Sequence, residues 1–123
     1  MGTSQFQAAD DRPGGGLLAF AHLDLGVTGR IAKPLPGRLY GLLVSNAGAA
    51  AAYVKLYNKA TAPTQADTPV MTIRVPAAGS VAYDSTIGVG FTAGISARAV
   101  TGVADSSTAA PAANDVVAAL FYA

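Results

Sequence analysis

The final segment of the chain decides the fold, and it reads Val116-Val117-Ala118-Ala119-Leu120-Phe121-Tyr122-Ala123. The last third, from Val70 onward, consists of short runs of Val, Ile, Thr and Tyr that are separated by Gly and Pro. β-Branched and aromatic residues favour strands, whereas Gly and Pro interrupt them. A free tail of this composition would expose an aggregation-prone edge. We therefore expect the last strand to lie inside the fold or against a neighbouring molecule.

Strand patterns also precede this region. Arg38–Asn46 is predicted to be a central strand because both of its faces are largely apolar. Its alternation places Leu42 and Val44 on one face and Leu39 on the other. The full set of predicted strands is Leu17–Asp24, Arg38–Asn46, Ala52–Asn58, Val70–Val75, Ser80–Asp84, Gly94–Thr101 and Asp115–Tyr122. Gly88-Val89-Gly90 reads as a bend after the fifth of these strands.

About six to eight short strands, with turn signals at roughly ten-residue spacing and no helical period, predict an all-β chain. We expect a single antiparallel β-sandwich over residues 17–123, of the jelly-roll or the immunoglobulin-like type. The sequence leaves the strand order open. Residues 1–16 are predicted to form a flexible N-terminal arm, because Gly14-Gly15-Gly16 reads as a hinge before the sandwich.

Composition limits the classes of function. The chain has 123 residues and carries eight Lys and Arg against seven acidic residues, all of them Asp, with the basic residues scattered singly. Nucleic-acid binding requires a basic stripe that this pattern lacks. Only 12% of residues are charged and 51% are hydrophobic, which predicts that other chains cover much of the surface. A monomer with a bland Ala, Thr and Ser surface is the alternative.

No stretch is long and apolar enough for a membrane helix, and the N-terminus lacks a secretory signal pattern, so we expect an unprocessed chain that does not enter a membrane. Catalytic patterns are missing as well. There is no Cys, and His22 is the only histidine, so a metal site or a catalytic triad is not expected. The aspartates are dispersed, and Asp67, Asp84, Asp105 and Asp115 read as turn residues. We predict no enzyme activity and no cofactor.

Surfaces remain as the candidate functional features. In Ala52–Asn58 the alternation predicts that Val54 and Leu56 are buried. The other face of that strand offers an exposed patch suited to a partner, although rings packed on the chain's own loops are an equal alternative. The arm offers a second contact. The candidate interface residues are Phe6, Arg12, Tyr53, Lys55, Tyr57, Lys59, Phe121 and Tyr122.

Several segments resemble a pattern found in small structural proteins of tailed bacteriophages and prophages. They span residues 38–123, and the arm shares no part of the resemblance. The segments are Leu39-Tyr40-Gly41-Leu42-Leu43-Val44-Ser45-Asn46, Ala52–Thr64, Asp67–Val70, Gly94–Ala97, Thr101–Asp105 and Leu120–Tyr122.

The resemblance implies a virion β-sandwich protein that decorates and cements the phage head, made in the host cytoplasm and located on the head surface. It implies that the major capsid protein is the partner and that the chain forms a homotrimer, with the arm and one sandwich edge gripping the shell. Deleting residues 1–16 should then weaken attachment more than folding. The alternatives are a tail or fibre component, including a receptor-binding module, and a free carbohydrate-binding sandwich. The lack of Trp weakens the last of these.

Overall fold

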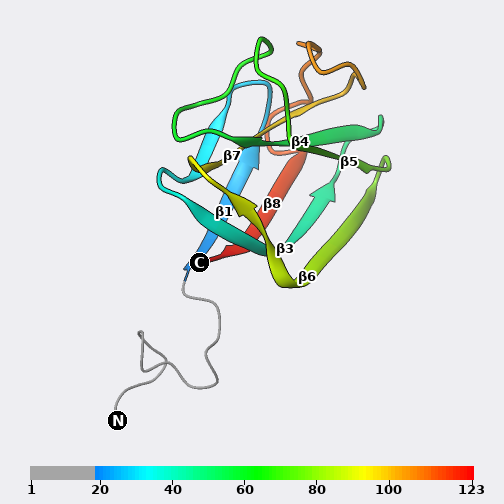
Figure 1. Cartoon of the computed structure of the whole chain (residues 1–123). Helices are drawn as coiled ribbons and strands as arrows, with labels where there is room; N and C mark the ends of the chain where they lie inside the picture. The colour runs from blue at the N-terminus through cyan, green and yellow to red at the C-terminus, as the bar shows by residue number, and fades with distance from the viewer. Residues whose placement is uncertain (1–18) are drawn as a thin grey trace.

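Two four-stranded antiparallel sheets pack face to face in the computed structural model, which describes residues 19–123 and the side chains from Ala21 onward (Figure 1). This confirms the predicted all-β sandwich. The predicted arm, residues 1–16, lies outside the described residues. The strands are β1 (Ala19–Leu25), β2 (Arg30–Lys33), β3 (Gly37–Asn46), β4 (Ala52–Asn58), β5 (Met71–Val75), β6 (Gly79–Phe91), β7 (Ile95–Val100) and β8 (Val116–Tyr122).

The strand order is that of a jelly roll. Sheet A has the order β1-β8-β3-β6 and sheet B the order β2-β7-β4-β5. Only β4 and β5 are neighbours both in sequence and within a sheet. The other strands reach their partners across long sequence distances, as in an eight-stranded double Greek key. Of the two sandwich types expected from the sequence, the jelly roll is the one observed.

Apolar residues from both sheets fill the space between them. Val54 and Leu56 are 1% and 0% exposed, which confirms that this side of β4 meets the core. Met71 and Ile73 of β5 pack against the same cluster. The buried core consists of Leu25, Leu39, Leu42, Val44, Ala52, Val54, Leu56, Val75, Phe91, Ile95, Ala97, Ala99, Val116, Ala118 and Leu120.

Strand β3 is central, as predicted, because it pairs with β8 on one side and with β6 on the other. Its face assignment was wrong at Leu39, which is fully buried in the core together with Leu42. The pairing of β3 with both neighbours shifts register between Leu39 and Gly41. This irregularity leaves Tyr40 out of the pairing and turns Leu39 to the core side.

The predicted bend at Gly88 lies inside a longer strand. Strand β6 continues to Phe91 instead of ending at Asp84, so Asp84 is a strand residue and its assignment to a turn was wrong. Gly88 has a φ of 82°, a conformation that glycine adopts without strain, and it belongs to the irregular part of β6 opposite the β3 shift. Strand β2 was missed because its four residues lie between Gly29 and Pro34.

Candidate interaction surface

The two sheets present very different outer faces. On sheet B, the outward side chains of the two inner strands β4 and β7 are almost completely buried, although they do not point into the core. We call this the covered face. Its central residues are Tyr53, Lys55 and Tyr57 of β4 and Ser96, Arg98 and Val100 of β7, which are paired across the two strands.

Loops of the same chain bury the covered face. Arg98 is 0% exposed, and its Nη1 atom donates to the Tyr57 hydroxyl at 3.0 Å. Its Nε atom donates to the carbonyl oxygen of Val27 at 3.3 Å, in the loop after β1. Its Nη2 atom donates to the carbonyl oxygen of Ser107, in the loop that joins β7 to β8. One guanidinium therefore ties two loops to the sheet.

Lys55 reinforces the same attachment. It is 0% exposed, and its Nζ atom donates to the carbonyl oxygen of Val103 at 3.1 Å and lies 3.8 Å from a carboxylate oxygen of Asp105. Lys55 and Arg98 are directly opposite each other in the β4–β7 pair. Like charges in that position repel, so the carbonyl groups and Asp105 must offset the repulsion of two buried cations.

Tyr57 completes this buried polar cluster. Burial raises the pKa of its hydroxyl above the ordinary 10.0, and the hydrogen bond from Arg98 opposes part of that shift. The neutral hydroxyl therefore accepts the hydrogen bond from the guanidinium throughout the physiological pH range. The cluster has a structural role, because each of its polar contacts holds a loop or a strand of the same chain.

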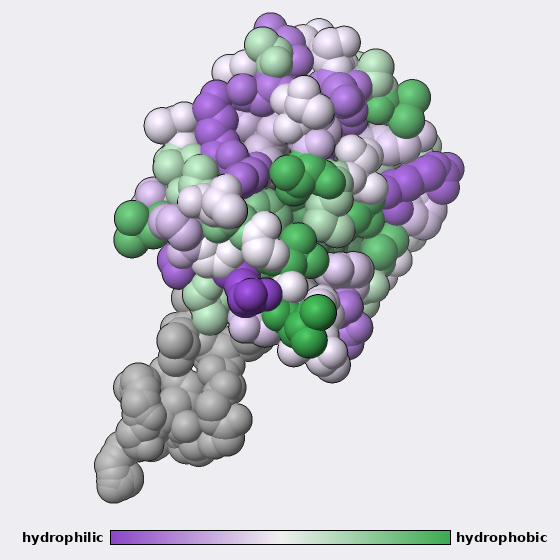
Figure 2. Space-filling view, in the orientation of Figure 1, coloured by the Kyte–Doolittle hydropathy of each residue, from purple (hydrophilic) through white to green (hydrophobic). Residues whose placement is uncertain are grey.

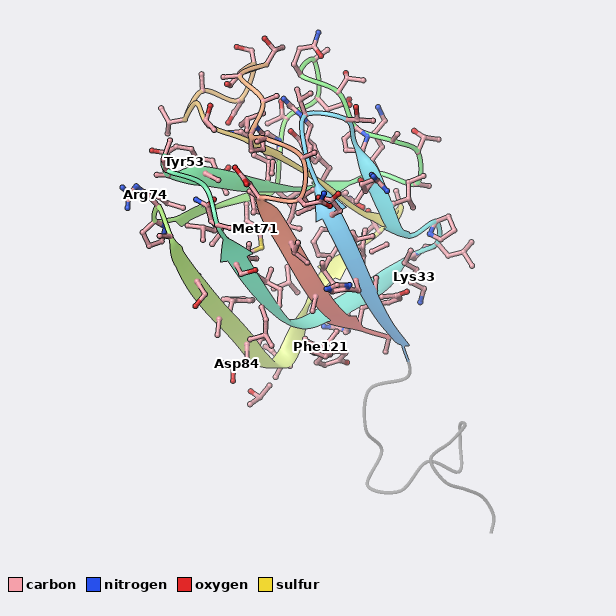
Figure 3. All side chains as sticks on the ribbon, turned by 180° about the vertical axis from the view of Figure 1, so that it is seen from behind. Lys33, Tyr53, Met71, Arg74, Asp84 and Phe121 are labelled. Atoms are coloured by element: carbon pink, nitrogen blue, oxygen red, sulfur yellow. The ribbon has the colours of Figure 1, made fainter. Side chains whose placement is uncertain are left out.

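The predicted exposed patch on β4 is therefore absent from this structure. Lys55 and Tyr57 lie under the chain's own loops, which is the alternative that the sequence left open. Tyr53 is half-buried and opposite Arg74 of β5 (Figure 3). Lys59 forms an ion pair with Asp67, with its Nζ atom 2.8 Å from a carboxylate oxygen.

Asp67 organises the loop between β4 and β5. Its carboxylate accepts hydrogen bonds from Lys59 and from the backbone N–H of Thr64, each at 2.8 Å. These two contacts hold the pKa of the Asp67 carboxyl below its ordinary 3.8. Pro63 of the same loop is buried and lies against Gly29, in the loop that precedes β2. The prediction of Asp67 as a turn residue is confirmed.

Sheet A presents the contrasting surface, which we call the open face. Its outward residues form three rows across the four strands. The middle row contains Leu43, which is 52% exposed, and Ala82, which is also exposed. Within the described residues, no loop buries these positions. The open face consists of His22, Asp24, Gly41, Leu43, Ser45, Ser80, Ala82, Asp84, Val117, Ala119 and Phe121.

Charge on the open face is confined to its margins. Asp24 lies on the edge strand β1 and Asp84 on the edge strand β6, whereas β8 and β3 contribute only small, apolar or hydroxyl side chains. Figure 2 shows that, on the side of the body seen in Figure 1, exposed hydrophobic residues are also scattered among polar ones. An exposed sheet face of this composition is a candidate for contact with another molecule.

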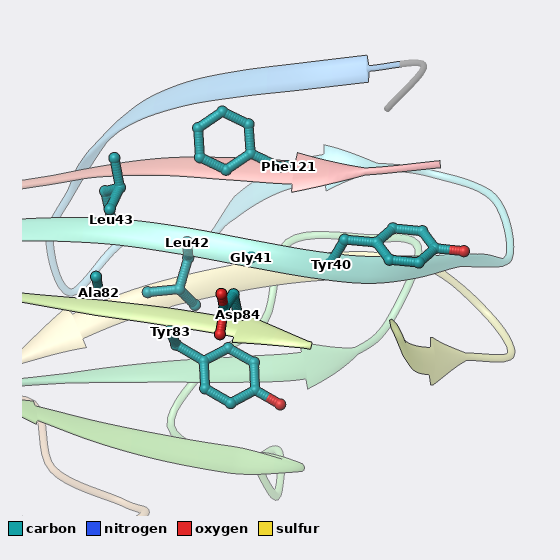
Figure 4. A pocket seen from close by; sticks show the side chains of 8 residues that line it. All are labelled: Tyr40, Gly41, Leu42, Leu43, Ala82, Tyr83, Asp84 and Phe121. Carbon is teal, nitrogen blue, oxygen red and sulfur yellow. The ribbon is translucent and has the colours of Figure 1, made fainter. Parts of the chain in front are cut away.

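Two shallow grooves cross the open face. The first, with a volume of about 370 Å³, runs past Gly41 between Phe121 and Asp84 (Figure 4). Because Gly41 has no side chain, a notch remains between its two neighbours in the row. The second groove, of about 360 Å³, lies over Leu43 and Ala119. Together the two grooves make the face uneven enough to accommodate side chains of a bound molecule.

Two of the predicted interface residues lie at the end of β8 and have different roles. Phe121 belongs to the open face and lines the first groove. Tyr122 packs against the core, and its hydroxyl donates to the carbonyl oxygen of Ala32 at 2.9 Å, which links sheet A to β2 of sheet B. Phe6 and Arg12 lie outside the described residues.

Other kinds of site find no support in residues 19–123. No group of three or more His, Cys, Asp or Glu side chains in this range is arranged to hold a metal ion. His22 is exposed on β1. Within the same range there is no helix that is long and apolar enough to span a membrane.

No protein-family model, curated protein or solved structure matches the chain.

Sequence reasoning missed most of the open face. Leu43, Ala82 and Asp84 received no functional interpretation, because each lies in a strand whose neighbours were unknown. A signal was present in β8, where Val117 and Ala119 alternate with core residues and make both faces of the strand apolar. In β7 the outward positions are Ser96, Arg98 and Val100, and nothing in this pattern indicated that Arg98 would lie under loops of the same chain.

Proposed function

We propose that this chain is a structural protein of a bacteriophage virion that decorates and stabilises the head by binding the major capsid protein. The observation that carries the proposal is the open face, which is nearly uncharged, exposes Leu43 and is not covered by any loop within the described residues. The resemblance of residues 38–123 to phage structural proteins supports it. Jelly rolls are common in viral capsid domains, which is an analogy at the level of the fold only.

The size of the open face favours attachment in many copies. Four strands about 4.8 Å apart, each with about three outward residues, span roughly 400 Å². A stable pairwise interface needs about 800 Å² from each partner. A single contact through this face is therefore weak, and a regular array of identical contacts, strengthened by a homotrimer, supplies the missing affinity through avidity.

Copy number tests the proposal directly. Quantitative mass spectrometry of purified virions gives the ratio of this chain to the major capsid protein. A ratio near one, or a simple fraction of it, is the expected result. Absence of the chain from virions contradicts the proposal.

A surface variant tests the face itself. Leu43→Asp places a charge at the centre of the open face, where the side chain is already exposed, and should abolish co-sedimentation with heads that lack the protein. Thr72→Asp is the matched control, because Thr72 is exposed on β5 of sheet B. Equal binding by both variants would exclude the open face as the contact.

The second candidate is a tail or fibre component, including a receptor-binding module. The first groove favours it, since an acidic side chain and an aromatic ring both line this groove. A handful of copies per virion, together with hits on a glycan array, would support this role over head decoration.

A further inference from the structure

Strand β6 has a long free edge. It forms one margin of sheet A and, within the described residues, pairs with β3 alone. Alternate residues of an edge strand direct their backbone N–H and C=O groups away from the sheet. Figure 1 shows β6 at the margin of the molecule. An edge of this kind is a template for pairing with a further strand.

Two other edges carry features that discourage such pairing. Strand β2 has only four residues, begins with Arg30 and ends with Lys33, and its pairing with β7 is irregular. Strand β5 has five residues, including Arg74, and is followed by Pro76. By contrast, the regular part of β6, residues 79–84, contains no Lys, Arg or Pro. It therefore lacks the residues that protect an edge.

The side chains of this segment are incompletely covered. Val81 and Tyr83 pack against the core but are only half-buried. Ser80, Ala82 and Asp84 are exposed on the open face. No residue in the described part of the chain forms a hydrogen bond or an ion pair with the Asp84 carboxylate. A strand added to this edge would cover apolar surface on one side of the sheet and meet an unpaired carboxylate on the other.

The sequence of the segment is complementary to itself. Antiparallel pairing of two identical strands about Ala82 places Ser80 of each chain opposite Asp84 of the other. The serine hydroxyl can then donate to the carboxylate. The same register places Val81 opposite Tyr83, and an aliphatic side chain facing an aromatic ring is a favourable cross-strand pair. Pairing centred on Asp84 would instead oppose two carboxylates, which is destabilising.

The ends of the segment fit this register. Before β6, the chain turns at Ala78, which has a φ of 51°. After Asp84, four residues of β6, residues 85–88, lie opposite the single residue Tyr40 of β3 and form a bulge. The regular edge therefore runs from the turn to the bulge, with Ala82 near its middle.

We propose that two copies of this chain pair antiparallel through their β6 edges, about a two-fold axis at Ala82. The two four-stranded A sheets then form one sheet of eight strands. Because the axis is perpendicular to the sheet, both open faces lie on the same side and form one continuous surface. Its area is about 800 Å², twice that of one chain, which is the size that a stable interface needs from each partner.

The pairing concerns the free protein and holds whatever molecule the open face binds. The measurements below need no virions, so their outcome is independent of the copy number that tests head decoration. A homotrimer would require a contact of another kind, because a two-fold contact joins chains in pairs.

Single cysteines test the register, because the chain has no Cys of its own. Ala82→Cys should form a disulfide between two copies under mild oxidation, since directly opposite residues of antiparallel strands lie within reach of such a bond. Ser80→Cys and Asp84→Cys should each cross-link poorly alone and readily when mixed. Thr72→Cys is the control, because Thr72 is exposed on β5 of sheet B. Equal cross-linking of Ala82→Cys and Thr72→Cys would overturn the proposal.

Sedimentation velocity measures the association itself. The unaltered protein should have the mass of two chains, and the mass of one chain or of three chains would overturn the proposal. Ala82→Lys places two cations opposite each other at the axis and should give a monomer. Ser80→Lys places a cation opposite Asp84 of the second copy. It should lower the dissociation constant by about two- to thirtyfold, since two equivalent ion pairs form. Weaker association in both lysine variants would show that the register is wrong.

Discussion

The outer faces of the two sheets of this jelly roll are both formed by antiparallel strands, but loops of the chain bury one face and leave the other exposed. On sheet B, Arg98 and Lys55 hold loops against the strands. Their polar groups are buried, and hydrogen bonds to the loops and to Tyr57 offset the cost of that burial. On sheet A, Leu43 and its neighbours stay small or apolar and carry no loop within the described residues. Burial of polar groups thus marks the side that the chain covers for itself, and exposure of apolar groups marks the side that no loop of the described residues covers.

The largest expected effect lies on the covered face. Arg98→Ala removes three hydrogen bonds and leaves buried acceptors without a donor, so the free energy of unfolding should fall by about 3–5 kcal/mol. Urea denaturation measures the change. Arg74→Ala is the matched control, since Arg74 is exposed on the same sheet and should shift stability by no more than about 0.5 kcal/mol. Equal effects would mean that the loops do not depend on the guanidinium.

Tyr57→Phe should have a smaller effect with a distinctive pH dependence. Loss of the hydroxyl costs about 1 kcal/mol. Because the pKa of Tyr57 is raised in the folded state, its stabilising contribution is complete below the ordinary pKa of 10.0 and is lost as the pH rises through the raised value. Urea denaturation between pH 9 and 12, with tyrosinate absorbance, should show this step in the wild type only. A step that persists in Tyr57→Phe would assign it to another group.

Asp67, in the loop between β4 and β5, should make the stability of the protein depend on pH in the acidic range. The pKa of Asp67 is lowered, so its contribution to stability is present above the ordinary 3.8 and is lost as the pH falls through the lowered value. Asp67→Asn should remove that acid-dependent change. Urea midpoints measured from pH 6 down to pH 2 check this. The effect should be modest because Lys59 and Asp67 are both partly exposed.

The smallest effect on stability is expected on the open face. Leu43→Ser should change the free energy of unfolding by less than about 0.5 kcal/mol, because the side chain is already half in water. Leu42→Ala, one residue away but 1% exposed, should cost about 2–5 kcal/mol. Urea denaturation of the pair tests the contrast between the two sides of one strand. A large loss in Leu43→Ser would show that the open face contributes to the fold of the free chain.

Local patterns were sufficient for the sandwich and insufficient for its surfaces. The alternation in β4 identified Val54 and Leu56 as core residues because a period of two needs no knowledge of other strands. The covered face depended on Arg98 lying opposite Lys55, a pairing fixed by the strand order, which local sequence does not contain. The burial of Leu39 depended on a register shift shared by three strands, and no feature of β3 alone encodes it.

The order in which the strands are synthesised differs from the order in which they pair. Strand β8 lies between β1 and β3, so β1 has no partner in its sheet until the ribosome has added residues about a hundred positions later, from Val116 to Tyr122. Contacts of such long range slow folding. The first strand therefore has no partner in its sheet when it is synthesised, and sheet A closes only after β8 has left the exit tunnel.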